Sequence, residues 1–279
     1  MSHEIEPTPA QPAYWNGPTA DRRAASWQLL ERADAESTAA VLRLAAPRAG
    51  ERVLDIGCGA GATTLLLREH VVPGGAVTGI DVSAPILAVA RERAAGTGVT
   101  FVEADASSHA FRPELDLLFS QFGVMFFAEP RLAFANLLRA AAAGGRLAFI
   151  CWRPPADNAW VTAPLGAARE LLPGIEPPPV GAPGPFGLAD RDHVHGVLER
   201  AGWREIQIER DDHARLFGET VEEAAQTALA IGVLPRFTAH LDADSRDRLR
   251  DRLRDALAPF HGPSGVLLPA STWLVSAHA

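Results

Sequence analysis

Residues 53–61 (Val-Leu-Asp-Ile-Gly-Cys-Gly-Ala-Gly) combine a short apolar run, an acid and three alternating glycines. An apolar run followed at once by a helical pattern from Ala62 predicts a buried strand that turns tightly into a helix. The glycines leave room for a ligand, because a side chain there would block its approach. Asp55 would repel a diphosphate, so the turn favours a cationic ligand. The alternative is a turn that needs small residues for packing alone, since many nucleotide-binding folds share glycine-rich turns.

Two further acids follow at the ends of apolar segments. Asp81 closes the run 77–81 and lies 20 residues after Gly61, a distance that suits a carboxylate bonding ribose hydroxyls. Asp105 closes a third run, 101–106. Because the carboxyl ends of parallel strands meet at one edge of a sheet, these acids are predicted to lie close together.

This combination of turn and acids resembles the class I S-adenosylmethionine (SAM)-dependent methyltransferases. The similarity is to the small-molecule group that includes the ubiquinone and menaquinone biosynthesis methyltransferases. Its specific motifs lie between Val53 and Trp152. The resemblance implies a Rossmann-like, doubly wound α/β fold, with a seven-stranded sheet, an antiparallel last strand and a helical cap. It also implies SAM as the cofactor and S-adenosylhomocysteine (SAH) as its product.

In that family the acid–glycine turn cradles the methionine part of SAM, the second acid holds the ribose, and the third contacts the adenine amino group. Carried over to this sequence, the cofactor-binding residues are Asp55, Gly57, Cys58, Gly59, Gly61, Thr63, Asp81, Val82, Asp105, Ala106, Ser120 and Gln121. Related enzymes often have an arginine where Gln121 stands. That departure weakens the expectation of an anionic group on the substrate.

Alternating hydrophobic patterns place the elements that must position these residues. Strands are predicted at 52–56, 76–81, 99–103, 115–119, 146–152, 205–210 and 272–276. Helices are predicted at 20–33, 36–46, 61–70, 83–95, 130–143, 158–172, 190–201, 220–231 and 244–258. Ser83, Asp190 and Thr220 are expected to cap helices, and Gly144 and Gly202 to close them.

The segments around this core divide the chain into six parts. They are an N-terminal arm with helices at 1–50, the SAM-binding core at 51–152, a cap insertion at 153–189, a core helix and strand at 190–210, a helical cap insertion at 211–268 and the closing strand at 269–279. Tyr14 and Trp15 end a proline-rich arm. They either anchor the arm to the body or form a flap over the cofactor, and the two are compatible.

The methyl acceptor is expected beside the end of the fourth strand, between residues 121–126, residues 152–160 and the cap. The candidate substrate residues are Tyr14, Trp15, Phe122, Met125, Phe126, Trp152 and Trp160. Their aromatic character suits a flat, uncharged molecule. The alternative is that these side chains only pack in the interface between the sheet and the cap and contact no substrate. No general base is identified, because surface positions are the commoner fate of His193, His195, His213, His240 and His261.

Composition excludes several functions. All 26 basic residues are arginine, so Schiff-base chemistry and a phosphate-loop lysine are ruled out. The net charge of -8 argues against a nucleic-acid partner. Cys58 and Cys151 are not spaced as metal ligands, and no metal is expected. The sequence shows neither a signal-peptide pattern nor an apolar run long enough to span a membrane, so a cytoplasmic protein without a membrane partner is expected. A monomer or a homodimer is expected.

The sequence therefore predicts a methyltransferase that modifies O, N or C of a small, largely apolar metabolite, of the kind found in secondary metabolism. Three alternatives remain open. One is a SAM-binding protein that does not transfer methyl groups, and another is a different SAM-dependent reaction such as decarboxylation or cyclisation. The third is a nicotinamide oxidoreductase, against which Asp55 argues.

Overall fold

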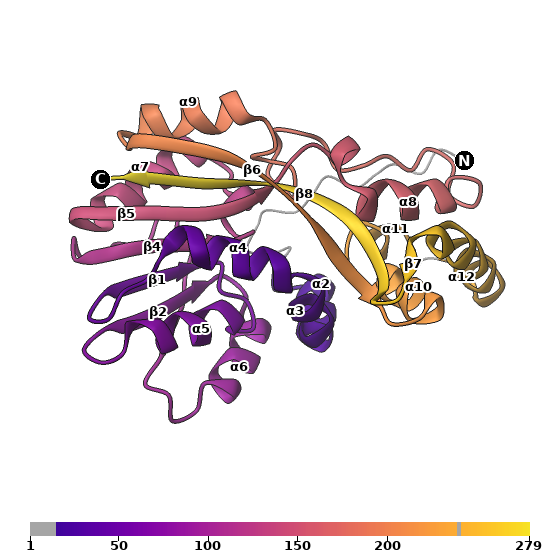
Figure 1. Ribbon diagram of the computed structural model, residues 1–279, viewed down its shortest axis with the longest axis horizontal. Coiled ribbons are helices and arrows are strands. Elements are labelled where there is room, and N and C mark those ends of the chain that lie inside the picture. The colour runs from indigo at the N-terminus through magenta and orange to yellow at the C-terminus, as the bar shows by residue number, and fades with distance from the viewer. Residues whose placement is uncertain (1–14, 239–240) are drawn as a thin grey trace.

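A single mixed sheet forms the centre of the molecule (Figure 1). The computed structural model describes residues 15–238 and 241–279. Within them the strand order is β3-β2-β1-β4-β5-β8-β6, and the two-residue β7 pairs with β8 outside this path. β8 is antiparallel to both of its neighbours, β5 and β6, while β1 to β5 run parallel. This arrangement confirms the predicted seven-stranded sheet with an antiparallel last strand.

All seven predicted strands form; the first four agree with their predicted bounds to within two residues, and the last three are longer. Their bounds are β1 Arg52–Ile56, β2 Ala76–Asp81, β3 Thr100–Glu103, β4 Leu115–Gln121, β5 Ala141–Trp152, β6 Arg204–Gly218, β7 His261–Gly262 and β8 Gly265–His278. Asp55 lies opposite Gly79 of β2 and Phe119 of β4. The parallel register therefore brings the carboxyl ends of β1, β2 and β4 to one edge.

Alternate residues of the sheet pack against different helices, as strand geometry requires. Val53, Val77 and Phe119 belong to one buried cluster, which includes residues of α4 (Ala35–Ala45) and α5 (Ala62–Val71). Leu54, Ile80 and other residues of the opposite face pack with α7 (Pro130–Ala140) and α9 (Arg191–Ala201). Figure 1 shows α4, α5 and α6 (Ala84–Arg93) on one side of the sheet and α7 and α9 on the other. Both faces are thus covered.

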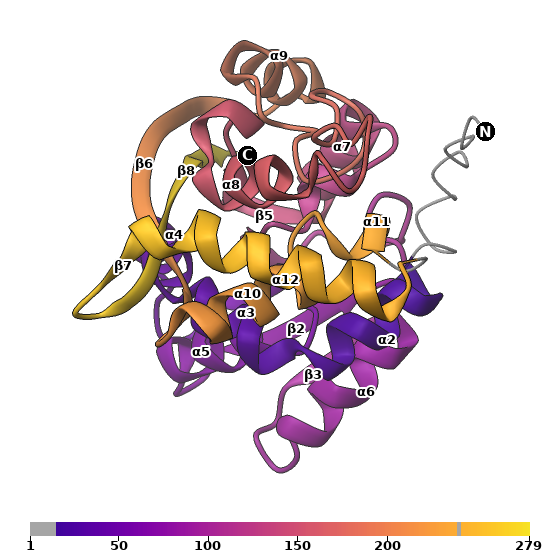
Figure 2. The same ribbon diagram turned by 90° about the vertical axis from the view of Figure 1, so that its right-hand side faces the viewer.

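The last two long strands extend well beyond the sheet into the cap (Figures 1 and 2). The expected strands 205–210 and 272–276 are too short, because β6 and β8 stay paired from Arg204–His278 to Gly218–Val266. Polar residues 210–213 conceal the strand in the sequence. The cap helices α8 (Ala159–Ala168), α10 (Val221–Ala230) and α12 (Ala243–Leu257) gather around this extension, with the short α11 (Pro235–Thr238).

Helix α12 shows how a highly charged sequence docks in the cap. Leu249, Leu253 and Leu257 are fully buried, as their spacing predicts. Its aspartates and arginines form exposed pairs such as Arg250–Asp247. The charge run is therefore a solvated face, as expected.

Three local predictions are wrong. The predicted helix 20–33 is divided into α2 (Pro18–Ala25) and α3 (Trp27–Ala33) at Ser26. The helix predicted at 130–143 ends at Ala140, so Gly144 does not close it and instead lies in β5. Ser83 makes no capping hydrogen bond: Pro85, the second residue of α6, has no N–H to donate, and the Ile86 amide is not bonded by the Ser83 hydroxyl.

The predicted caps at Asp190, Thr220 and Gly202 are confirmed, whereas the helix predicted at 158–172 ends at Ala168. The carboxylate of Asp190 accepts a hydrogen bond from the His193 amide, and the hydroxyl of Thr220 accepts one from the Glu223 amide. Gly202 ends α9 in the left-handed conformation, with φ 100°.

Candidate functional site

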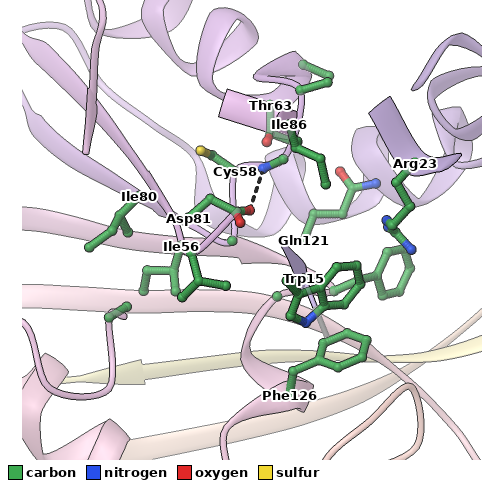
Figure 3. Close-up of a pocket in the computed structure, with 18 of the residues that line it drawn as sticks. Trp15, Arg23, Ile56, Cys58, Thr63, Ile80, Asp81, Ile86, Gln121 and Phe126 are labelled. Atoms are coloured by element: carbon green, nitrogen blue, oxygen red, sulfur yellow. Dashed lines mark hydrogen bonds between the residues drawn. The ribbon is translucent and has the colours of Figure 1, made fainter. Parts of the chain in front are cut away.

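A cavity of about 390 Å³ opens at the carboxyl edge of the parallel strands (Figure 3). The expected site residues that line it are Trp15, Gly57, Cys58, Gly59, Thr63, Asp81, Val82, Asp105, Ala106, Gln121, Phe122 and Phe126. Figure 3 shows Asp81 and Cys58 toward one end, and Trp15 and Phe126 together at the other. The cavity therefore joins the predicted cofactor segments to the aromatic residues expected around the acceptor.

Seven expected residues are not placed at this cavity. Asp55, Gly61, Ser120, Met125, Trp152 and Trp160 lie behind its wall, and Tyr14 lies outside the described residues. Ser120 is buried because its hydroxyl donates to the Ile56 carbonyl at 2.8 Å and accepts from the Gly123 amide at 3.2 Å. Gly61 begins α5, where a Cβ would come within 3.1 Å of the Phe101 ring. Both residues hold the turn together from behind.

The glycine turn forms the wall of the cavity with bare backbone. Gly57 has φ 68°, and a Cβ there would lie 2.7 Å from the Gly123 Cα. Gly59 has φ 54°, but a Cβ there would meet only Ile86 Cγ2, at 3.8 Å. Both glycines have a left-handed backbone, and at Gly57 a side chain would also clash with Gly123. At Gly59 there is space for a Cβ, so the missing side chain leaves room in the cavity.

Asp55 lies beneath the turn and does not face the cavity as expected. One carboxylate oxygen accepts hydrogen bonds from the hydroxyls of Thr63, at 2.7 Å, and Thr64, at 2.6 Å. The other oxygen, Oδ1, is buried and has no hydrogen-bond partner. Burial raises the pKa of Asp55 to about 6, against the opposing effect of the two hydroxyls. Because the Asp55 carboxylate is hydrogen-bonded to α5, its side chain points away from the cavity. Its negative charge can therefore attract a cationic ligand only through the backbone of the turn.

Asp81 occupies the position predicted for a ribose-binding carboxylate. Its Oδ2 accepts a hydrogen bond from the Gly59 amide at 3.0 Å, and its Oδ1 accepts one from the Ser83 amide at 2.9 Å. Burial raises the pKa of Asp81, while these hydrogen bonds and the charge of Arg23 act in the opposite direction. Each oxygen keeps further acceptor capacity, so the group can accept two hydroxyls of a diol.

Asp105 and Ala106 follow β3 and line the same cavity. Asp105 Oδ1 accepts a hydrogen bond from the Ser107 amide at 2.8 Å. Asn136 of α7 donates to the Ala106 carbonyl at 3.1 Å. This loop therefore presents a carboxylate on a fixed backbone.

Aromatic rings close the other end of the cavity. Trp15 packs edge-to-face on Phe126, with ring centroids 5.1 Å apart. Phe122 has a left-handed backbone, with φ 59°, and its ring stacks on Trp152 at 4.1 Å. Because Phe122 covers Trp152, and Trp160 packs behind Trp152 at 4.8 Å, those two tryptophans support the wall and do not form its surface.

Helices α2 to α4 contribute cavity residues that the sequence did not reveal. These are Arg23, Trp27, Leu30, Glu31, Asp34 and Thr38. Arg93 of α6 pairs with Glu31, lies 3.8 Å from the Trp27 ring centroid and donates to the Ala60 carbonyl of the glycine turn at 2.7 Å. The segment 18–45 has only the pattern of amphipathic helices, and no local signal shows which side lies over the turn.

Asn16, just before α2, is hydrogen-bonded to the turn that follows Asp81. The Asn16 side chain donates to the Val82 carbonyl at 2.8 Å and accepts from the Ala84 amide at 3.0 Å. Trp15 is thereby brought to the cavity.

Metal and thiol chemistry have no site of their own in the described residues. In residues 15–238 and 241–279, no group of three histidine, cysteine, aspartate or glutamate side chains could hold a metal ion. Cys58 and Cys151 are buried free thiols, and burial raises the pKa of each.

No helix in the described residues 15–238 and 241–279 is long and apolar enough to cross a membrane.

Comparison with known proteins agrees with this geometry. A family pattern described as a methyltransferase domain matches residues 54–149. Nocamycin O-methyltransferase of Saccharothrix syringae is 30% identical over 231 aligned residues, covering 72% of this chain and 82% of that protein. The chain belongs to the class I SAM-dependent methyltransferases.

Two further comparisons show how much of the chain is similar to other methyltransferases in sequence and in fold. Demethylmenaquinone methyltransferase of Thermus thermophilus is 39% identical over 121 residues, and that match spans 42% of this chain and 54% of the relative's length. The phosphoethanolamine N-methyltransferase 2 of Haemonchus contortus superposes with a TM-score of 0.57 at 18% identity. It covers 94% of this chain, which in turn covers 57% of that structure, and it supports the fold alone.

The cavity of the methyltransferase fits SAM. Gly59 leaves the surface open, and Asp81 has acceptor capacity for a ribose. The unpartnered Oδ1 of Asp55 places negative charge behind the turn, where a sulfonium or ammonium would be favoured.

Proposed function

We propose that this methyltransferase transfers the methyl group of SAM to O, N or C of a small, flat and largely apolar metabolite. The observation that carries the proposal is the shared cavity, which has the acid–glycine turn at one end and Trp15, Phe122 and Phe126 at the other. SAM supplies an electrophilic methyl group. The chain supplies alignment of the two ligands and exclusion of water.

In this proposal each cofactor residue that lines the cavity keeps its predicted role. Gly57 and Gly59 lie along the methionine part of SAM, Asp81 accepts the ribose hydroxyls, and Asp105 with Ala106 meets the adenine edge. Asp55 acts from beneath the turn through its charge. Trp15, carried by the residues fastened at Asn16, closes the cavity as a flap, and the cap bounds the acceptor end.

The enclosed aromatic end supports methyl transfer over simple SAM binding, because a protein that only bound SAM would have no need of a second lined region. Another SAM-dependent reaction, such as a cyclisation, would use the same cavity. Only analysis of the product distinguishes it from methyl transfer. Oxygen is the first acceptor atom to test, since nocamycin O-methyltransferase, a relative that aligns over 82% of its length, is named for transfer to oxygen.

The test is incubation of the purified protein with methyl-labelled SAM and fractions of a bacterial extract or a set of small phenols, enols and amines. We expect label in a small organic product, with one molecule of SAH released per product. The Asp81→Ala variant should abolish both. SAM binding without labelled product in any fraction would favour the binding-only alternative. SAH release without label in the acceptor would indicate a different reaction.

We also propose that the reaction needs no metal. The acids at the sheet edge already accept hydrogen bonds from backbone amides or threonine hydroxyls, so they are committed to the turn and its ligand. Turnover should be unchanged by a strong chelator. Activity lost with the chelator and restored by magnesium would contradict this.

A further inference from the structure

Asp34 places a second carboxylate at the acceptor end of the cavity. It lies between α3 and α4, and its side chain lines the cavity while remaining only 14% exposed. Arg215 of β6 reaches it from behind, with Nη2 2.7 Å from Asp34 Oδ1. An acid from the N-terminal helices is thus held in place by a strand of the cap.

Arg215 is buried in an aromatic enclosure. Its side chain is 3% exposed, and its guanidinium carbon lies 4.6 Å from the Trp160 ring centroid and 5.1 Å from that of Trp152. Trp152 in turn stacks on Phe122, which lines the cavity. The guanidinium therefore holds Asp34 by charge, since Asp34 Oδ1 has no hydrogen-bond partner, and it also packs on Trp152, which supports the aromatic wall.

The polar strip continues along the first turn of α4. The Thr38 hydroxyl lies 2.9 Å from Gln121 Oε1 and 2.9 Å from the Asp34 carbonyl oxygen. Asp34, Thr38 and Gln121 all line the cavity, as do the rings of Trp15, Phe122 and Phe126. The acceptor end thus combines a polar strip with an aromatic wall.

The chemistry of this strip restricts the ligand. A carboxylate accepts hydrogen bonds and donates none, so a group that meets Asp34 must be a donor. An anionic group would be repelled by Asp34. A cationic group gains little, because Arg215 already balances the charge at a short distance. An uncharged hydroxyl on a flat apolar body satisfies both sides.

We propose that Asp34 is the specificity-determining residue of the acceptor end and accepts a hydrogen bond from a hydroxyl of an uncharged, flat, apolar substrate. Arg215 is its positioning residue. This inference rests on the proposed function, because it assigns the aromatic end to the acceptor. It adds the class of substrate and the residue that selects it.

The test uses three probes with the SAH-saturated protein: 2-naphthol, 2-methoxynaphthalene and 2-naphthoate. They share a flat apolar body and differ only in offering a donor, no donor or an anion. We expect the wild type to bind 2-naphthol about tenfold more tightly than 2-methoxynaphthalene, the size of one good hydrogen bond, and to reject 2-naphthoate.

Asp34→Asn should reduce the preference for 2-naphthol and, because Arg215 is then unbalanced, should bind 2-naphthoate. The double variant Asp34→Asn with Arg215→Met removes both charges and keeps an apolar side chain between the tryptophans. It should lose the preference for 2-naphthol without gaining 2-naphthoate. A merely structural pair would not produce this exchange of selectivity, and the double variant guards against loss of folding from an unpaired buried charge.

Asp157→Asn is the matched control. Asp157 pairs with the buried Arg153 at 2.7 Å, but neither residue lines the cavity, so probe selectivity should stay as in the wild type. Wild-type protein that binds none of the probes, or binds 2-naphthol and 2-methoxynaphthalene equally, would overturn the inference. So would a loss of SAH affinity in Asp34→Asn, which would make Asp34 a cofactor ligand. Labelled product from SAM in an extract would still uphold the proposed function in either case.

Discussion

Asp55 is a buried carboxyl group whose charge is costly in the absence of a ligand. Only one of its oxygens has hydrogen-bond partners, and burial raises its pKa to about 6. An acid with a raised folded-state pKa favours folding when it is protonated. That contribution is fully present below the unfolded-state pKa near 4 and is lost as the pH rises through about 6.

Asp55→Asn should therefore change the pH dependence of stability. Without ligand, the free energy of unfolding of the variant relative to the wild type should rise by about 2–4 kcal/mol between pH 4 and pH 8. SAM should also bind the wild type more tightly as the pH rises over this range, and that slope should be smaller in the variant, which keeps only the contribution of Asp81. Urea titrations and calorimetry at both pH values measure the two effects. Parallel stability curves for the two proteins would show that Asp55 does not titrate in this way.

Asp81 is the residue on which cofactor affinity should depend most directly. Asp81→Ala removes the acceptor for two ribose hydroxyls, which should cost roughly 2–4 kcal/mol of SAM binding, or about 30- to 700-fold in Kd. Calorimetry measures the change, and circular dichroism checks that the variant is folded. An affinity within a few-fold of the wild type would remove Asp81 from the ribose assignment.

At the scale of elements, the segment 15–17 before α2 brings Trp15 to the cavity. The two hydrogen bonds of Asn16 fasten it to the turn that follows β2. Trp15 packs edge-to-face on Phe126 at the same end of the cavity. We propose that this segment opens and closes as a flap, and that its closure excludes water from both ligands.

Asn16→Ala should increase the dissociation rate of SAM, by about three- to tenfold for the loss of one or two exposed hydrogen bonds. Deleting residues 1–18 should weaken both ligands further. Stopped-flow tryptophan fluorescence measures the rate. Unchanged dissociation in both variants would show that the segment is an anchor and not a flap.

Phe122, at the end of β4, tests the other side of the cavity. Phe122→Ala should raise KM for the acceptor or lower kcat, while the Kd for SAM changes little, because the ring faces the aromatic end. Steady-state kinetics with an acceptor found by the labelling experiment measure the split between KM and kcat. A variant with full turnover and only a lower Tm would mean that the ring serves packing alone.

At the scale of the whole molecule, β6 and β8 join the cap to the sheet. They pair from the sheet to the cap helices, with register shifts near both ends of the pairing, and Arg215 on β6 reaches Asp34 between α3 and α4. This strand pair thus connects the acceptor end, the N-terminal helices and the core. We expect the three parts to unfold together.

Leu253→Ala examines this coupling from the buried face of α12. Deleting a fully buried leucine should cost about 2–5 kcal/mol and should lower the Tm of the whole protein in one transition. Leu132→Ala on α7 is the control, since Leu132 is 52% exposed and should cost less than about 0.5 kcal/mol. Calorimetry that resolves a separate early transition for Leu253→Ala would show an independently folding cap.

The sequence alone determined the parallel core and the cofactor edge. Short apolar runs, a glycine turn and acids at strand ends are local signals, because each depends on residues a few positions apart. Gly57, Gly59, Asp81 and Asp105 therefore lie where the pattern predicts. The antiparallel last strand was predicted by family resemblance, and the structure confirms it.

Only the tertiary structure decided which face each side chain presents and what lies opposite it. Asp55 turns under the glycine loop because Thr63 and Thr64 of α5 offer their hydroxyls there. Asp34 becomes a cavity residue because Arg215, 181 positions later in the chain, arrives behind it. Such contacts leave no periodic trace in either segment, since they arise from packing between elements that are distant in sequence. For that reason the cofactor edge and the aromatic residues Trp15, Phe122 and Phe126 could be predicted from the sequence, whereas the pairing of Asp34 with Arg215 could not.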